Sequence, residues 1–146
     1  MRKMLDKYGH EMSPHLVDFL LKNWTAEDFT NANLARKKLN NKMWRLMQKY
    51  DFLLTPTLTT PAFPVHMQGP EKIEGKIVHP FQWLSFTFPI NLTGQPAASL
   101  PAGWTSNGLP VGIQIVGRHL ADQSVLDACA AFEKASPWAD KWPEIT

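Results

Sequence analysis

The sequence has almost no cysteine, little net charge and no long apolar run. It contains one cysteine in 146 residues, so no disulfide can form within the chain, and we expect a reducing, cytoplasmic setting. Its formal net charge is only +2, which is too small to predict binding to nucleic acid or to an anionic membrane. The apolar runs are short, such as residues 52–54, and none is long enough to span a bilayer. We therefore expect neither nucleic acid nor membrane as a partner.

The histidines, serines and glycines form none of the spacings that mark a familiar catalytic or metal site. None of the five histidines forms a His-x-x-x-His pair, and a single cysteine cannot supply a thiolate zinc site. No serine stands in a Gly-x-Ser-x-Gly motif, and no glycine-rich phosphate loop is present. Cys129 falls on the apolar stripe of an expected helix, which favours a packed thiol over a nucleophile. The residues alone predict no metal, no cofactor and no self-contained active site.

Proline, by contrast, is abundant and unevenly placed. Nine of the 12 prolines lie within residues 56–110. Proline lacks a backbone donor and clashes with the preceding helical turn. Long uninterrupted helices are therefore excluded from this window, which leaves short strands, turns and helix ends.

The first third of the chain is expected to be helical. Ser13 precedes Pro14, a pair typical of a helix start with serine as the N-cap. Thr25 begins a longer helix, with Asp28 three residues on as a variant of the capping box. Apolar residues then recur at steps of three or four and predict one buried face: Ala32, Ala35, Leu39, Met43, Leu46, Met47 and Tyr50. The basic residues lie mostly off this face, as on an ordinary solvated surface.

The middle of the chain predicts short elements. Residues 51–56 are expected to form a strand stopped by Pro56, and residues 71–78 either a small hairpin or a loop. Pro80 is expected to open a short helix that ends before Pro89.

The last 50 residues predict a hairpin and a helix. Residues 97–100 and 111–116 are expected to be strands, joined by a turn at residues 106–108 because Asn-Gly tolerates positive φ angles. A final helix from Asp122 to Pro137 is expected to bury Val125, Leu126, Cys129 and Phe132. We also expect Arg118 and Asp122 to pair at its start. Helices beside buried strands indicate an α/β chain.

Four motifs follow one another between residues 53 and 118. They are Leu53-Leu54-Thr55-Pro56-Thr57, then Phe86-Thr87-x-Pro89-x-Asn91-Leu92-Thr93-Gly94-x-Pro96-Ala97, then Leu100-Pro101-Ala102-Gly103, then Gly108-Leu109-Pro110-Val111-Gly112-x-Gln114-x-Val116-Gly117-Arg118. In this order they resemble the amidase signature family, and Phe132-x-x-x-x-Pro137-Trp138 is similar to that family's C-terminal end.

The resemblance covers almost the whole chain but only about the final third of the family's chain. It implies that residues 1–146 are a C-terminal fragment of a single amidase domain. Residues 1–50 would be helical, and residues 51–146 would supply strands, proline-rich loops and a final helix. The implied fold is α/β, the C-terminal part of the amidase signature fold, with a mixed β-sheet flanked by helices.

The resemblance also implies what this chain does and does not contribute. Family enzymes hydrolyse a carboxamide with a Ser–cis-Ser–Lys triad, whose lysine and Gly/Ser-rich loop belong to the part with no counterpart here. No catalytic residue can therefore be assigned, and the chain alone is expected to be inactive. The family's aromatic stretch helps line the acyl-side pocket, which implies substrate contacts for Trp83, Leu84, Thr87, Phe88 and Asn91.

Alternatives remain for these residues. Four of them, Leu84, Thr87, Phe88 and Asn91, stand at i, i+3, i+4 and i+7 and so share one helical face. Trp83 and Phe88 could equally be core residues, because buried aromatic rings dominate core packing. Asn91 and Gln114 are expected to satisfy backbone groups rather than to touch substrate.

The A subunit of the tRNA-dependent amidotransferases belongs to the same family and is the main rival. That branch usually carries a Tyr-x-x-Asp-like element before the Asn-Leu-x-Gly motif, where this chain has His79-Pro80-Phe81-Gln82-Trp83-Leu84-Ser85-Phe86. The difference favours a general amidase, and an aromatic wall would suit an apolar or aromatic acyl group. Its partner would be a small amide substrate, bound only together with the missing N-terminal part. A different class of function is a non-enzymatic module that self-associates through exposed sheet edges.

Overall fold

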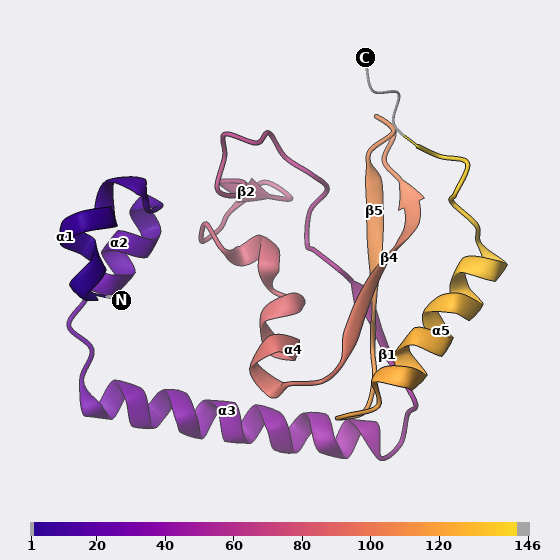
Figure 1. Ribbon diagram of the computed structural model, residues 1–146, viewed down its shortest axis with the longest axis horizontal. Coiled ribbons are helices and arrows are strands. Elements are labelled where there is room, and N and C mark those ends of the chain that lie inside the picture. The colour runs from indigo at the N-terminus through magenta and orange to yellow at the C-terminus, as the bar shows by residue number, and fades with distance from the viewer. Residues whose placement is uncertain (1, 143–146) are drawn as a thin grey trace. The chain divides into compact units, whose positions relative to one another are not determined.

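The computed structural model describes residues 2–142 (Figure 1). The expected span of 1–146 also includes residues 1 and 143–146, which lie outside the described residues. The chain forms two compact units, Met1–Ala35 and Arg36–Thr146. The boundary between them falls within helix α3 (Ala26–Met47), so each unit is described by itself.

The first unit is built from short helical segments. They are η1 (Arg2–Met4), α1 (Leu5–Tyr8), η2 (Gly9–Glu11), α2 (Pro14–Leu21) and the first turns of α3. The predicted cap of α2 is confirmed, because the Ser13 hydroxyl accepts a hydrogen bond from the Leu16 backbone N–H at 3.4 Å. The capping box of α3 is confirmed too. The Thr25 hydroxyl accepts from the Asp28 N–H at 3.1 Å, and Asp28 Oδ2 accepts from the Thr25 N–H at 3.0 Å.

The second unit contains a three-stranded sheet in the order β1-β5-β4. Its strands are β1 (Leu53–Pro56), β4 (Ala97–Trp104) and β5 (Pro110–Val116), and both pairs are antiparallel. The tight turn between β4 and β5 contains Gly108 at φ +77°, as Asn-Gly predicted. Strand β4 runs four residues past the expected end at Leu100, because a bulge between Pro101 and Gly103 lets the pairing continue.

Each free edge of this sheet carries a proline. The Thr57 N–H donates to the Gly112 carbonyl at 2.9 Å, and alternate residues of an antiparallel pair bond inward. The polar backbone groups of Leu54 and Pro56 therefore point out from β1. By the same alternation, Pro101 faces outward from β4. Each proline removes one N–H donor from its edge, which limits pairing with a further strand.

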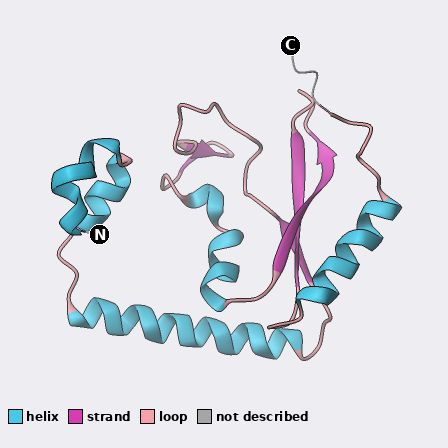
Figure 2. Cartoon of the chain, in the orientation of Figure 1, coloured by secondary structure: helices cyan, strands magenta, loops and turns pink. Residues whose placement is uncertain are grey.

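Helices cover both faces of the sheet (Figure 2). On one face, α4 (Thr87–Thr93) and the end of α3 build a core of Met43, Met47, Ile90 and Val116, with Leu46 and Leu53 packed against it. On the other face, α5 (Asp122–Ala135) packs across β4 and β5. Its Val125 is only 3% exposed. These helices and the sheet form the expected α/β arrangement.

Two expectations of local structure in the second unit are settled by the remaining elements. Residues 71–78 do form a hairpin, from β2 (Lys72–Ile73) and β3 (Lys76–Ile77). The expected helix from Pro80 that ends before Pro89 is wrong. A 3-10 turn, η3 (Gln82–Leu84), is followed by α4 with Pro89 in its first turn. Proline fits there because first-turn N–H groups have no partner within a helix.

Three side-chain expectations are also wrong. Leu126 is 60% exposed, because α5 presses Val125 against the sheet and the next residue turns 100° away from it. Arg118 does not pair with Asp122. Its guanidinium reaches back 67 residues to Asp51, with Nη2 at 3.0 Å from Oδ1. Tyr50, expected on the buried face of α3, lies beyond the helix end and is exposed.

Candidate functional site

The five candidate substrate residues lie on one continuous segment, η3 and α4, in the second unit. Trp83 and Leu84 belong to η3, whereas Thr87, Phe88 and Asn91 belong to α4. The Thr87 hydroxyl donates to the Leu84 carbonyl at 3.1 Å and so ties the two short helices together. Because the chain changes helix type between them, Leu84 does not continue the face of α4 as the i, i+3, i+4, i+7 spacing predicted.

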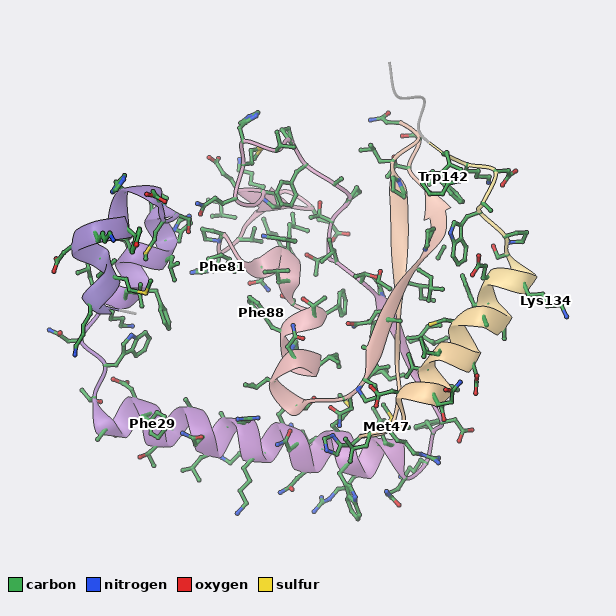
Figure 3. The ribbon with its side chains drawn as sticks, in the orientation of Figure 1. Phe29, Met47, Phe81, Phe88, Lys134 and Trp142 are labelled. Atoms are coloured by element: carbon green, nitrogen blue, oxygen red, sulfur yellow. The ribbon has the colours of Figure 1, made fainter. Side chains whose placement is uncertain are left out.

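Phe88 and Asn91 lie together on the outer side of α4. The helix buries Ile90 and Thr93 toward the core, so residues about half a turn away face outward. Phe88 is 49% exposed, and its ring projects from α4 (Figure 3). Asn91, one turn on, is exposed as well. These two side chains form the part of the candidate site that is free to meet a ligand.

Trp83 is held by the loop that precedes it. Its indole N–H donates to the Gln68 carbonyl at 3.1 Å, and its ring meets Phe63 edge-on at 5.2 Å between centroids. The Trp83 carbonyl accepts the Thr59 N–H at 3.2 Å. The indole is therefore fixed in orientation, and one ring edge is occupied by protein.

Two polar side chains anchor α4 to the rest of the unit. Gln114 is 5% exposed, and its Nε2 donates to the Phe86 carbonyl at 3.1 Å and to the Thr55 hydroxyl at 3.0 Å. The expectation that Gln114 satisfies a backbone group is thus confirmed. At the other end of α4, Arg36 Nε donates to the Leu92 carbonyl at 2.9 Å. Both bonds fix the position of Phe88 and Asn91 relative to the sheet.

The chemistry of the five candidates is that of a pocket wall. They offer an indole, an aliphatic chain, a phenyl ring, one hydroxyl and one amide. None of these groups acts as a general acid or base at neutral pH. Among residues 2–142 no three His, Cys, Asp or Glu side chains come together as a metal site would require. The segment can shape and orient a ligand, while the reacting groups would have to come from elsewhere.

A hydroxyl pair that the sequence did not single out lies across the sheet. Thr57 Oγ1 and Ser99 Oγ are 2.6 Å apart, directly over the backbone of Gly112. They border a small hollow of about 180 Å³. The sequence alone carries no signal for this pair, because the two hydroxyls meet across β5. Ser99 is opposite Gln114 on that strand, and the Thr57 N–H bonds to the Gly112 carbonyl.

A larger groove of about 610 Å³ lies at the turn end of the β4–β5 hairpin. Its walls bring together the hairpin and the segment after α5, about 30 residues apart in the chain. Three of the six tryptophans line it: Trp104, Trp138 and Trp142. The high tryptophan count was the available signal, although spacing alone could not bring these three together.

No helix within the described residues is both long enough and apolar enough to cross a bilayer. This finding concerns residues 2–142 only.

The chain is similar in sequence to known amidases. Residues 6–126 match the family described as Amidase. An acylamidase of Rhodococcus erythropolis is 36% identical over 137 residues, which cover 91% of this chain and 28% of that enzyme. The A subunit of the glutamyl-tRNA(Gln) amidotransferase of Thermodesulfovibrio yellowstonii is 39% identical over 113 residues, which cover 75% of this chain and 22% of that protein. The chain thus spans under a third of the length of these relatives.

The fold agrees with the sequence comparison. The crystal structure of a bacterial aryl acylamidase of the amidase signature enzymes superposes with a TM-score of 0.78 at 29% identity, over 94% of this chain and 29% of that one. The motifs, the family match over residues 6–126 and this superposition all lead to one assignment. The chain belongs to the amidase signature family.

Proposed function

We propose that this chain acts as the C-terminal segment of a carboxamide-hydrolysing amidase. It supplies part of the sheet and, through Trp83, Leu84, Thr87, Phe88 and Asn91, part of the acyl-side pocket. The reacting serines and lysine come from the portion of the domain for which this chain has no counterpart. On its own the chain is inactive, and a small amide substrate binds only to the complete domain. The single cysteine fits a cytoplasmic location for that domain.

The incomplete sheet is the observation that carries this proposal. Strand β1 is an edge of the sheet and has no strand paired on its outer side. The side chains beside this edge are nevertheless apolar. An open hollow of about 350 Å³ crosses its outer face, lined by Leu54, Pro56, Val111 and Ile113 among others. Leu54 is more than half exposed. A contiguous apolar surface beside an unpaired strand is typical of a face that another element covers.

The extent of the match favours the acylamidase branch over the amidotransferase branch. The acylamidase aligns with 91% of the chain, against 75% for the amidotransferase protein, although the latter is slightly more identical where it aligns. The segment before Asn91 also lacks the Tyr-x-x-Asp-like element of the amidotransferase branch. An exposed phenyl ring at Phe88 suits an apolar or aromatic acyl group.

A first experiment measures turnover by the purified chain alone. Benzamide and propionamide are incubated with it, and released ammonia is measured. We expect no release above that of a heat-treated sample. Ammonia release that persists through further purification steps would overturn the proposed dependence on the missing part.

A second experiment joins this chain to the rest of a related amidase. The 28% of the Rhodococcus acylamidase that this chain matches is replaced by this chain in a chimera. We expect the chimera to hydrolyse amides, and the same acylamidase truncated without replacement to be inactive. A chimera that folds but hydrolyses nothing would contradict the proposed scaffold role.

A non-enzymatic, self-associating module is the second candidate, and the same open edge favours it. The edge offers the backbone groups of Leu54, but Pro56 beside it lacks an N–H, which weakens strand-to-strand pairing. Light scattering over a hundredfold range of concentration separates the two. The module predicts a mass that rises with concentration, whereas a strictly monomeric chain would exclude it.

A further inference from the structure

The groove at the turn end of the hairpin is aromatic on both sides. Trp104 and Leu109 come from the hairpin, and Trp138 and Trp142 come from the segment after α5. Its volume of about 610 Å³ falls within the range of small-molecule pockets, about 300–1,000 Å³. The groove therefore has the size and the apolar walls that a flat organic molecule requires.

One cation lies at the wall of the groove. Among the described residues that line it, Lys141 is the only ionisable one, and its ammonium lies 4.0 Å from the centre of the Trp104 ring. This cation–π contact places the charge at the wall without neutralising it. The ammonium has three N–H donors and no acceptor. A bound molecule would therefore meet indole faces and one cation.

The groove is separate from the candidate pocket on α4. Strand β4 runs eight residues from Ala97, near the end of α4, to Trp104. The α4 helix and the segment after α5 lie on opposite sides of the sheet (Figure 1). A ligand in this groove would thus leave Phe88 and Asn91 free.

We propose that this groove binds a planar aromatic carboxylate. The ring would stack on the indoles of Trp138 and Trp142, and the carboxylate would accept a charge-assisted hydrogen bond from Lys141, whose ammonium lies over Trp104. Such a bond is stronger than a neutral one, so the anion is favoured over an uncharged ligand of the same shape. The charge complementarity of Lys141 is what selects this class of ligand.

The test compares two probes of equal shape, 2-naphthoate and 2-naphthamide, with the whole chain. Binding is followed by the NMR signals of the indole N–H groups. We expect saturable binding of naphthoate with a Kd on the order of 1 mM or below. Naphthamide should bind about threefold to tenfold more weakly. Equal Kd values for the two probes, or no saturation, would overturn the proposal.

Two variants assign the effect to the groove. Lys141→Met keeps the apolar stem and should remove the preference for naphthoate. Trp142→Ala should weaken both probes by about fivefold to tenfold, because it removes one stacking surface. Trp142 is 81% exposed, so the variant should leave the fold intact. If naphthoate bound both variants as it binds the unaltered chain, the groove would not be its site.

A matched control removes one positive charge at a position outside the groove. Lys134 lies on α5 and outside the groove lining (Figure 3). Lys134→Met should bind both probes like the unaltered chain. A loss of preference in Lys134→Met equal to that in Lys141→Met would mean that net charge, rather than the groove, selects the anion.

Discussion

Arg118 and Asp51 join the two strands of the antiparallel β1–β5 pair at one end. Arg118 follows β5 and Asp51 precedes β1, and the guanidinium Nη2 lies 3.0 Å from the Asp51 carboxylate. The same guanidinium donates from Nε to the Met47 carbonyl at 2.9 Å. One side chain thus caps the last turn of α3 and fixes the entry to the sheet, where helix carbonyls otherwise lack a partner.

Removing Arg118 should therefore cost more than removing Asp51. Arg118→Ala leaves the Met47 carbonyl unpaired, and a hydrogen bond from a charged donor is worth about 1.5–3 kcal/mol. We expect the free energy of unfolding to fall by about 1–2 kcal/mol. Asp51→Asn affects only an exposed ion pair and should cost less than about 0.5 kcal/mol. Urea unfolding measures both. A larger loss in Asp51→Asn would show that the ion pair, not the helix cap, matters.

The hydroxyl groups of Thr57 and Ser99 leave no room for a side chain at Gly112. A Cβ at this position would lie 2.7 Å from Thr57 Oγ1 and 2.8 Å from Ser99 Oγ. Gly112→Ala should therefore destabilise the sheet by about 1–3 kcal/mol through overpacking. Gly103→Ala is the matched control in β4, because its Cβ meets nothing within 4 Å. Equal unfolding midpoints for the two variants would contradict the close approach over Gly112.

The helix starts could be predicted because their determinants are local. Ser13 with Leu16, and Thr25 with Asp28, act across three residues, so the sequence displays both partners together. The β4–β5 turn was predictable for the same reason, since Asn-Gly carries its own backbone preference. The motifs single out the segment of the candidate substrate residues, but its division into η3 and α4 could not be predicted from them.

The features that could not be predicted depend on contacts between residues far apart in the sequence. The partner of Arg118 was expected at Asp122, four residues away, but lies at Asp51 because the antiparallel pairing of β1 with β5 brings that carboxylate closer. Leu126 has the spacing of a buried residue, yet only the packing of α5 on the sheet decides which of its neighbours is covered. The three-tryptophan groove arises in the same way from two separate segments.

The carboxylate of Asp28 should titrate below its ordinary range. The Thr25 backbone N–H, and after it the Thr25 hydroxyl, lower the pKa of Asp28. A lowered folded-state pKa means that its stabilising effect is present above the unfolded pKa and is lost as the pH falls through the folded pKa. NMR titration of the Asp28 side chain should show this low midpoint. Thr25→Val removes only the hydroxyl and should raise it partway. A midpoint unchanged by Thr25→Val would contradict the hydroxyl's contribution.

Cys129 should react slowly with thiol reagents. Burial raises the pKa of its thiol, so less thiolate is present at neutral pH, and the thiolate is the reactive form. Alkylation by iodoacetamide should therefore be slower in the native chain than in the same chain in urea, and its rate should keep rising above the pH at which an ordinary thiol levels off. Equal rates in the two states would show an accessible, ordinary thiol.

Trp83 and Phe88, both candidates for the pocket wall, should respond differently to substitution. Trp83→Phe loses the N–H donor to the Gln68 carbonyl while it keeps a ring against Phe63, so we expect a loss of about 1 kcal/mol in unfolding free energy. Phe88→Ala removes a half-exposed ring and should change stability by less than about 1 kcal/mol.

Substitutions of Trp83 and Phe88 should also have different effects on substrate binding in the amidase chimera. Phe88→Ala should raise KM for benzamide more than for propionamide, because only an aromatic acyl group gains from a ring at that position. Trp83→Phe should leave this ratio of KM values unchanged, since its indole is engaged by the loop at Gln68. If Trp83→Phe changed the ratio and Phe88→Ala did not, the ligand-facing side of the segment would be η3 rather than the outer face of α4.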